Sequence, residues 1–142
     1  MKYLLIVLFY FFTFTVWSKD IIIVELEERD GLYYSKLMGF PFSGESLVYL
    51  KNNQLSEKFN YKDGKLDGEY IKYYKSGQLE IRRNYKGGKL NGLCIMYYEN
   101  GQVYKKSNWK DSKLNGEWLQ YYKSGELAEK KKYKNGVVIK ND

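Results

Sequence analysis

The sequence contains no histidine, one cysteine and one proline among its 142 residues. Without histidine, the chain can hold no His-based catalytic triad, proton shuttle or His-ligated metal site. A single cysteine allows neither a disulfide within the chain nor a thiolate metal cluster. What the chain does contain is 16 Tyr, 7 Phe and 3 Trp, together with 24 Lys and Arg against 17 Asp and Glu. This aromatic content is too high for a disordered basic tail, so we expect a folded domain.

The N-terminal segment has the composition of a targeting sequence. Lys2 gives a positive start, Tyr3–Trp17 carries no charge and is largely apolar, and Ser18 is a small residue at the end of that run. The run is shorter than the roughly 20 residues of a membrane-spanning helix. Residues 1–18 therefore predict a secretory signal peptide, cleaved near Ser18, and an exported protein, either periplasmic or secreted. The alternative is an uncleaved signal anchor that tethers the chain to a membrane.

The rest of the chain repeats with a period of 24 residues. The segment that starts at Asn60 recurs at Asn84 and Asn108, each time followed by a tyrosine pair and a glycine-containing turn. Short runs of Tyr, Ile, Val, Leu and Trp between such turns are typical of strands. The sequence predicts an all-β fold: an antiparallel meander of stacked β-hairpins, about four 24-residue repeats, in an open-ended single sheet. We divide the chain into the signal peptide, an N-terminal capping hairpin at 19–41 and a repeat domain at 42–142.

The turns decide which side chains share a sheet face. Most glycines lie at recurring turn positions that require positive φ, and Asn53 and Ser112 replace glycine at two of them. A three-residue loop at 75–77 would pair Tyr73 with Leu79. A two-residue loop would instead place Tyr73 opposite Glu80. We take the first register, which places apolar side chains from every repeat on one face, and we expect this face to be the core.

The opposite face of this predicted sheet carries two regular rows of basic residues. The same register places Tyr70 beside Arg82 and Trp118 beside Lys130. A lattice of cations with rings along it is suited to an acidic protein surface or to anionic lipid headgroups. The alternative is an ordinary solvated sheet face, on which lysines prevent aggregation at strand edges. The candidate partner surface is Lys58, Arg82, Lys106, Lys130, Lys62, Lys86, Lys110, Lys134, Tyr70 and Trp118.

The repeat resembles a known family. The unit 60–83, with its pieces NYKDGKLDGE and YYKSGQL, is similar to the MORN-repeat variant of bacterial proteins, often assigned as YwqK-type antitoxins of toxin–antitoxin pairs. The lead-in RDGLYY at 29–34 is also similar to that family. The resemblance implies a meandering sheet of hairpins that works by binding, either neutralising a partner toxin or scaffolding proteins at a membrane.

The residue types present argue against catalysis. Cys94 has no histidine to activate it, and it stands where other repeats have Tyr70 and Trp118, so we expect a small buried hydrophobic residue. No phosphate-binding loop is present, and the turn aspartates lack the density of a calcium loop. We therefore predict a non-enzymatic protein without cofactor, metal or small-molecule substrate. Its expected partner is a protein, such as a toxin; the alternative is an anionic membrane surface, and no nucleic acid is expected.

Overall fold

The computed structural model describes residues 4–8, 21–22 and 25–139. Residues 1–3, 9–20, 23–24 and 140–142 lie outside the described residues, and with them most of the predicted signal peptide and its cleavage site. The described residues contain strands and no helix, which confirms the all-β prediction. The strands are β1 (Leu4–Leu8), β2 (Ile21–Ile22), β3 (Leu26–Arg29), β4 (Leu32–Ser35), β5 (Gly44–Tyr49), β6 (Leu55–Lys62), β7 (Lys65–Leu66), β8 (Gly68–Tyr73), β9 (Leu79–Lys86), β10 (Lys89–Leu90), β11 (Gly92–Tyr97), β12 (Val103–Lys110), β13 (Lys113–Tyr121), β14 (Leu127–Lys134) and β15 (Val137–Ile139).

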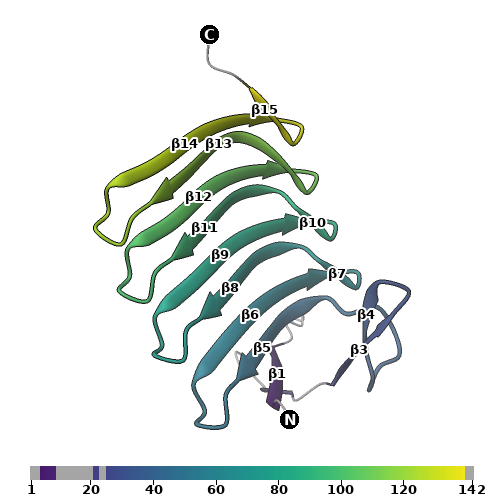
Figure 1. Ribbon diagram of the computed structural model, residues 1–142. Coiled ribbons are helices and arrows are strands. Elements are labelled where there is room, and N and C mark those ends of the chain that lie inside the picture. Colours follow the sequence, from purple (N-terminus) through teal and green to yellow (C-terminus); the bar gives the residue numbers. More distant parts are fainter. Residues whose placement is uncertain (1–3, 9–20, 23–24, 140–142) are drawn as a thin grey trace, which may run out of the picture.

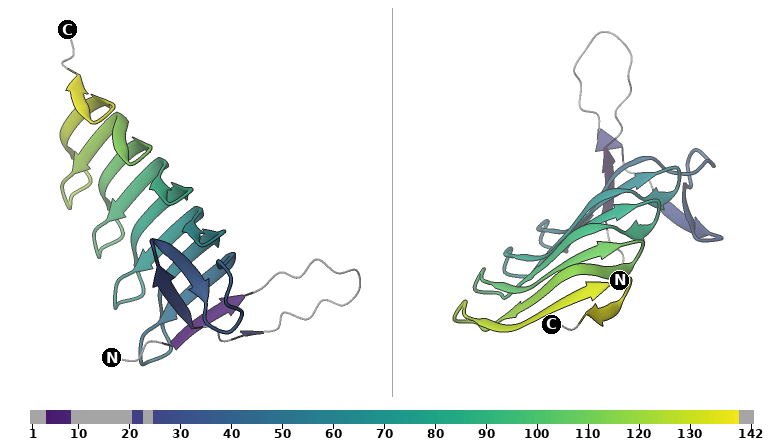
Figure 2. Two further views of the ribbon diagram at one scale, coloured as in Figure 1. Left: turned by 90° about the vertical axis from the view of Figure 1, so that its right-hand side faces the viewer. Right: turned by 90° about the horizontal axis from the view of Figure 1, so that it is seen from above.

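From β5 onward the strands follow one another along a single antiparallel sheet (Figure 1). The strand order runs β15-β14-β13-β12-β11-β9-β8-β6-β5-β1-β2, with β7 paired to β6 and β10 to β9. Figure 2 shows that this sheet is one curved layer, and no other described element lies over the hairpins of the later repeats. The predicted open meander of stacked hairpins is therefore confirmed.

Two kinds of turn alternate along the meander. On one side, two-residue turns such as Asp63-Gly64 have positive φ at both positions, 50° and 76°, as a turn matched to the twist of the strands requires. On the other side, Tyr74 N donates to the Gln78 carbonyl oxygen at 2.8 Å and closes the predicted three-residue loop. Asn53 and Ser112 have φ of 61° and 62°, which confirms that they replace glycine at left-handed positions.

A β-bulge directly after each three-residue loop changes the predicted register. Tyr73 lies opposite Leu79 as expected, but Lys72 then lies opposite Ile81, so that Glu80 is an extra residue. Its carboxylate accepts a hydrogen bond from Lys72 Nζ at 3.0 Å. The same shift recurs in the other three hairpins, where the extra residues are Ser56, Tyr104 and Ala128.

The bulge overturns the predicted pairing of rings with the first basic row. Tyr70 lies opposite Arg83, not Arg82, and Trp118 lies opposite Lys131, not Lys130. One inserted residue moves every later side chain of the strand to the other face of the sheet. The predicted single core face is wrong for the same reason, because the apolar residues before and after the bulge are divided between the two faces.

The N-terminal hairpin forms, although it is shorter than predicted. β3 and β4 are joined by the Asp30-Gly31 turn, and Ile22 pairs with β1 instead. The hairpin lies beside the first two-residue turn of the meander (Figure 1), where Tyr33 N donates to the Gly64 carbonyl oxygen at 2.8 Å. Its Tyr33 ring contacts the ring of Tyr61 at 5.0 Å between centroids. This end of the sheet holds the cluster formed by Phe42, Tyr61, Leu26, Tyr33, Phe59 and Leu66.

Candidate binding surface

The register assigns the predicted surface residues to two different faces. We call one the cationic face: in the second hairpin it carries Ile71, Tyr73, Leu79 and Arg82, and corresponding positions in the others. All eight predicted basic residues lie on it: Lys58, Arg82, Lys106, Lys130, Lys62, Lys86, Lys110 and Lys134. We call the other the aromatic face, and it carries the two predicted rings, Tyr70 and Trp118. The prediction that these rings border the lysine rows is therefore wrong.

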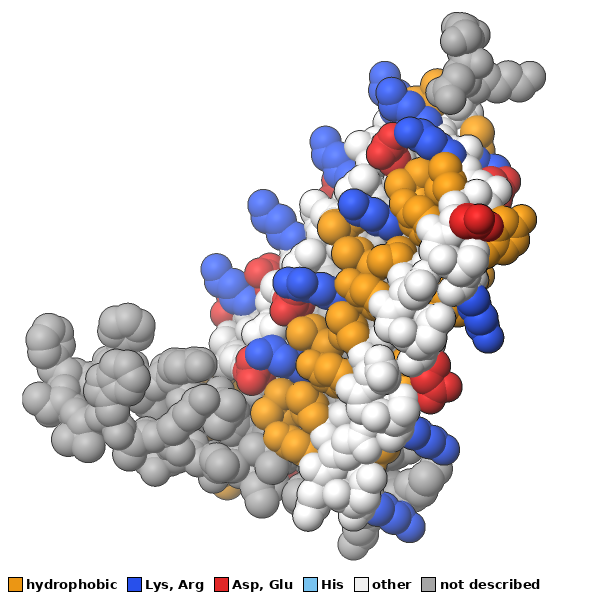
Figure 3. Space-filling view, turned by 90° about the vertical axis from the view of Figure 1, so that its left-hand side faces the viewer, with side chains coloured by type: hydrophobic (Ala, Val, Ile, Leu, Met, Phe, Trp, Pro, Cys, Tyr) orange, Lys and Arg blue, Asp and Glu red, His pale blue; other side chains and the backbone are white. Residues whose placement is uncertain are grey.

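An apolar ribbon runs along the cationic face. Each hairpin contributes a tyrosine before its three-residue loop and an aliphatic residue after it, and these pair directly across the strands. Figure 3 shows the outcome as a continuous hydrophobic band bordered by Lys and Arg side chains. The members of the ribbon are Tyr49, Leu55, Tyr73, Leu79, Tyr97, Val103, Tyr121 and Leu127. Most are half-buried, although Leu127 is 52% exposed.

Beside the ribbon, the first basic row is held by regular ion pairs. Each pair joins a basic residue to the glutamate 13 residues before it in the sequence. Lys130 Nζ lies 2.7 Å from Glu117 Oε1, and the Lys58–Glu45 and Arg82–Glu69 pairs have the same arrangement. Lys130, Lys132 and Lys106 together lower the pKa of the Glu117 carboxyl, with the hydrogen bond from Lys130 as the largest cause.

Lys106 breaks this pattern. The residue 13 positions before it is Leu93, so the third hairpin has no glutamate at this position. Within the described part of the chain, Lys106 is the member of the first row that forms no ion pair. Glu117, the carboxyl whose pKa Lys106 helps to lower, is paired with Lys130. Sequence analysis placed Lys106 in the row but missed this difference, although the replacement of Glu by Leu at 93 was visible in the repeat alignment.

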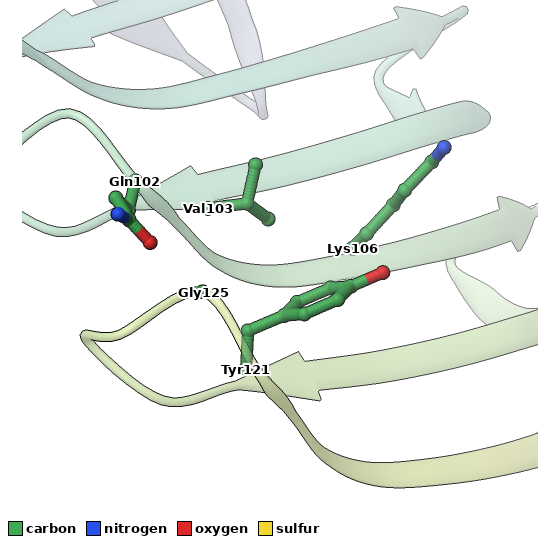
Figure 4. A pocket seen from close by; sticks show the side chains of 5 residues that line it. All are labelled: Gln102, Val103, Lys106, Tyr121 and Gly125. Atoms are coloured by element: carbon green, nitrogen blue, oxygen red, sulfur yellow. The ribbon is translucent and has the colours of Figure 1, made fainter.

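The same lysine borders a shallow hollow in the cationic face (Figure 4). The hollow has a volume of about 450 Å³ and is lined by Gln102, Val103, Lys106, Tyr121 and Gly125. Val103 occupies the ribbon position at which the other three hairpins have leucine, and the smaller side chain leaves more space there. Sequence analysis did not predict this hollow.

The second basic row lies nearer the two-residue turns. Lys62, Lys86, Lys110 and Lys134 are all exposed. None of the four forms an ion pair with another described residue. The cationic face therefore has a largely neutralised inner row and an outer row whose charges are open to solvent.

On the aromatic face, Lys and Arg side chains form cation–π contacts with aromatic rings of the same face. Lys105 and Lys131 lie over the Trp118 ring at 5.1 Å and 5.3 Å from the centroid, and Arg83 lies 5.7 Å from the Tyr70 centroid. Tyr70 Oη donates to Glu57 at 2.9 Å, and burial together with this bond raises the pKa of Tyr70. On the aromatic face these cations therefore lie against rings, and the buried Arg83 Nε has no hydrogen-bond partner among the described residues.

Cys94 lies on the aromatic face and is 4% exposed. It lies opposite Ser107, and burial raises the pKa of its thiol. This confirms the expected small buried residue at position 94. Among the described residues, no group of three or more His, Cys, Asp or Glu side chains is placed to hold a metal ion. In the same part of the chain, no helix is long and apolar enough to cross a bilayer.

Residues 66–86, 90–111 and 114–135 match the sequence profile of the MORN repeat variant. These three segments are similar to that repeat family. The upstream hairpin of β5 and β6 has the same three-residue loop and the same bulge as the matched MORN-variant repeats. No curated protein and no solved structure matches the chain.

Proposed function

We propose that this MORN-variant protein is a non-enzymatic binding protein and that a partner protein docks on its cationic face. The apolar ribbon is the observation that carries the proposal. It runs the length of the repeat sheet without a covering layer among the described elements, and it is bordered by cations (Figure 3). Apolar surface flanked by charge is typical of protein interaction sites, since the apolar part supplies affinity and the charged part supplies orientation.

Two biological settings follow from the resemblance to bacterial MORN-variant proteins. The partner is a toxin that this chain neutralises, or a protein that it holds at a scaffold. We further propose that the protein is exported after cleavage at Ser18. Such cleavage removes β1, which pairs with β5, and leaves the outer edge of the meander open. N-terminal sequencing of the protein from its envelope fraction tests this: a first residue of Lys19 supports export, and an intact N-terminus supports the signal anchor.

Affinity capture tests the binding function. The chain, tagged at its C-terminus, is used to recover partners from its own envelope fraction, with a Tyr97→Ser/Tyr121→Ser variant as the control for the ribbon. A single stoichiometric protein that is retained by the native chain and lost from the variant is the expected result. If the recovered protein is a small toxin, growth inhibition by that toxin is relieved on co-expression. Failure to retain any stoichiometric protein contradicts the proposal.

A second candidate is binding to an anionic membrane surface, because the outer row of four lysines is exposed and unpaired among the described residues. Each lysine near an anionic bilayer is worth about 1 kcal/mol. Co-sedimentation with phosphatidylserine-containing vesicles tests it. Binding that disappears at about 0.5 M salt, and in a variant with these four lysines changed to glutamine, supports this function. Vesicles that leave the protein in solution at low salt exclude it.

A further inference from the structure

The first basic row, which is the inner row of the cationic face, consists of Lys58, Arg82, Lys106 and Lys130. Its ion pairs show which chemical group neutralises these side chains. In three hairpins the basic residue is bound by a glutamate carboxylate that approaches from the preceding strand. In the third hairpin Leu93 occupies the place of that glutamate, and Lys106 forms no ion pair with another described residue. At this position the third hairpin therefore lacks a carboxylate that each of the other three hairpins carries.

The surroundings of Lys106 indicate what accompanies this carboxylate. The lysine borders the hollow that also contains Val103 and Tyr121 (Figure 4). The hollow has room for an apolar side chain of a partner, and half-buried Leu93 extends the apolar surface on the other side of Lys106. An ammonium between two apolar areas favours an acidic residue next to an apolar or aromatic one.

We infer that Lys106 and the adjoining hollow form a recognition site for an acidic–apolar segment of the partner protein, whose carboxylate takes the place that Glu45, Glu69 and Glu117 fill in the other hairpins. The inference rests on the proposed function, because it names the chemistry of the proposed partner. It also locates the contact in one repeat out of four, the one in which Leu93 replaces the glutamate.

The repeat itself supplies a matched set of variants. Leu93→Glu gives the third hairpin the ion pair of the others and is compatible with the fold, since three hairpins already carry glutamate there. Glu69→Leu makes the reverse change and frees Arg82. Lys106→Gln removes the charge from an exposed position. Circular dichroism and a cooperative unfolding transition confirm that each full-length variant is folded.

The probe is the peptide acetyl-Glu-Phe-Glu-amide, with acetyl-Gln-Phe-Gln-amide as its neutral counterpart, titrated into isotopically labelled full-length protein. We expect resonances of Lys106, Val103 and Tyr121 to shift with the acidic peptide. A charge-assisted hydrogen bond predicts a loss of affinity of about tenfold or more in Leu93→Glu and Lys106→Gln. Glu69→Leu is expected to add a second set of shifts around Arg82.

Three results overturn the inference. The first is equal affinity of Leu93→Glu and the native chain for the acidic peptide, and the second is equal affinity of the native chain for both peptides. The third is that the acidic peptide does not bind, whereas anionic vesicles or a second copy of the chain occupy the site and shift the same resonances.

Affinity capture separates this inference from the proposed function. If the native chain and Leu93→Glu retain the same partner equally, the proposed function stands and the Lys106 site is wrong. If no partner is retained but the peptide binds with the expected dependence on Leu93 and Lys106, the site stands and the proposed function is wrong.

Discussion

The hydroxyl of Tyr74 donates a hydrogen bond to the carbonyl oxygen of Tyr97, 2.7 Å away in the next repeat. The contact recurs one repeat later, where Tyr98 Oη donates to the Tyr121 carbonyl oxygen at 2.9 Å. In a single-layer repeat sheet, each hairpin depends on its neighbours for stability. These bonds therefore join successive repeats beyond the backbone ladder of the strands.

The hydrogen bonds that Tyr74 and Tyr98 donate to the next repeat give the first prediction. Tyr74→Phe and Tyr98→Phe should each lower the free energy of unfolding by about 0.5–1.5 kcal/mol, since each removes one hydrogen bond to a backbone carbonyl and keeps the ring. Tyr122→Phe is the matched control, because Tyr122 is 59% exposed and donates to no carbonyl among the described residues. Urea denaturation measures the three variants. Equal losses in all three would mean that the bonds between repeats add nothing.

The two-residue turns give the second prediction. Gly64 and Gly88 have similar φ, 76° and 81°, but only Gly64 is crowded. A Cβ added at Gly64 would lie 3.0 Å from the Tyr33 carbonyl oxygen, whereas at Gly88 the nearest atom is Lys65 Cβ at 3.9 Å. Gly88→Ala should therefore cost about 1–2 kcal/mol from its left-handed backbone alone. Gly64→Ala should cost at least about 1 kcal/mol more, because the β3–β4 hairpin must move.

Thermal or urea unfolding of these two variants measures the difference. The Tyr33–Tyr61 ring contact provides an independent reading by NMR, since it should change in Gly64→Ala and persist in Gly88→Ala. If the two variants are equally stable, the N-terminal hairpin does not pack on the first turn.

The fold could be predicted from the sequence because every repeat carries the same turn signals at the same positions. The period, the turn residues at Asp63-Gly64 and the three-residue loop before Gln78 are local features, and local features determine a meander of hairpins. The bulge at Glu80 is different. It shifts the pairing so that Lys72 lies opposite Ile81, and the extra residue has no common type among the four hairpins: Ser56, Glu80, Tyr104 and Ala128. The assignment of faces, and with it the position of Tyr70 and Trp118, was therefore beyond prediction from the sequence.

Part of the candidate site was also predictable from the repeat, and part depended on the register. Both basic rows follow from the repeat period, and all eight members share one face. The prediction that this face is opposite Ile71, Tyr73 and Leu79 is wrong, because the bulge brings them onto the same face. Lys106 differs from the other three members because it lacks the ion pair that they form with a glutamate 13 residues earlier. Recognising that pairing requires the register of the strands. Once the register is known, the exception at Leu93 is immediately evident.

The third prediction concerns alkaline pH. Burial and the hydrogen bond to Glu57 raise the pKa of Tyr70 above the ordinary value of 10.0. The unfolded chain thus releases this proton at lower pH than the folded protein does. The contribution of Tyr70 to stability is complete below about pH 10 and is lost as the pH rises from there toward the pKa of the folded state.

Unfolding in urea at pH 8 and pH 11 measures this effect. Tyr70→Phe should be less stable than the native chain at pH 8, because its hydrogen bond is gone, but it should lose less stability on going to pH 11. Tyr122→Phe, with its exposed ring, controls for the general effect of high pH on the lysines. A native chain and a Tyr70→Phe variant that lose equal stability would show that Tyr70 has no part in the alkaline transition.

The fourth prediction tests the bulge directly. Ile71 and Arg82 lie opposite each other and on the same face, whereas Ile81 points to the other face. Facing Cα atoms in an antiparallel pair are about 4.5–5.5 Å apart, within the range that a disulfide spans. In a Cys94→Ala background, Ile71→Cys/Arg82→Cys should form a disulfide on oxidation, and Ile71→Cys/Ile81→Cys should keep two free thiols, since their Cβ atoms point apart. Thiol titration and intact mass measure the outcome. Cross-linking of the second pair in place of the first would establish the uninterrupted register, restore Tyr70 to the side of the lysine rows, and separate Lys106 from Tyr121.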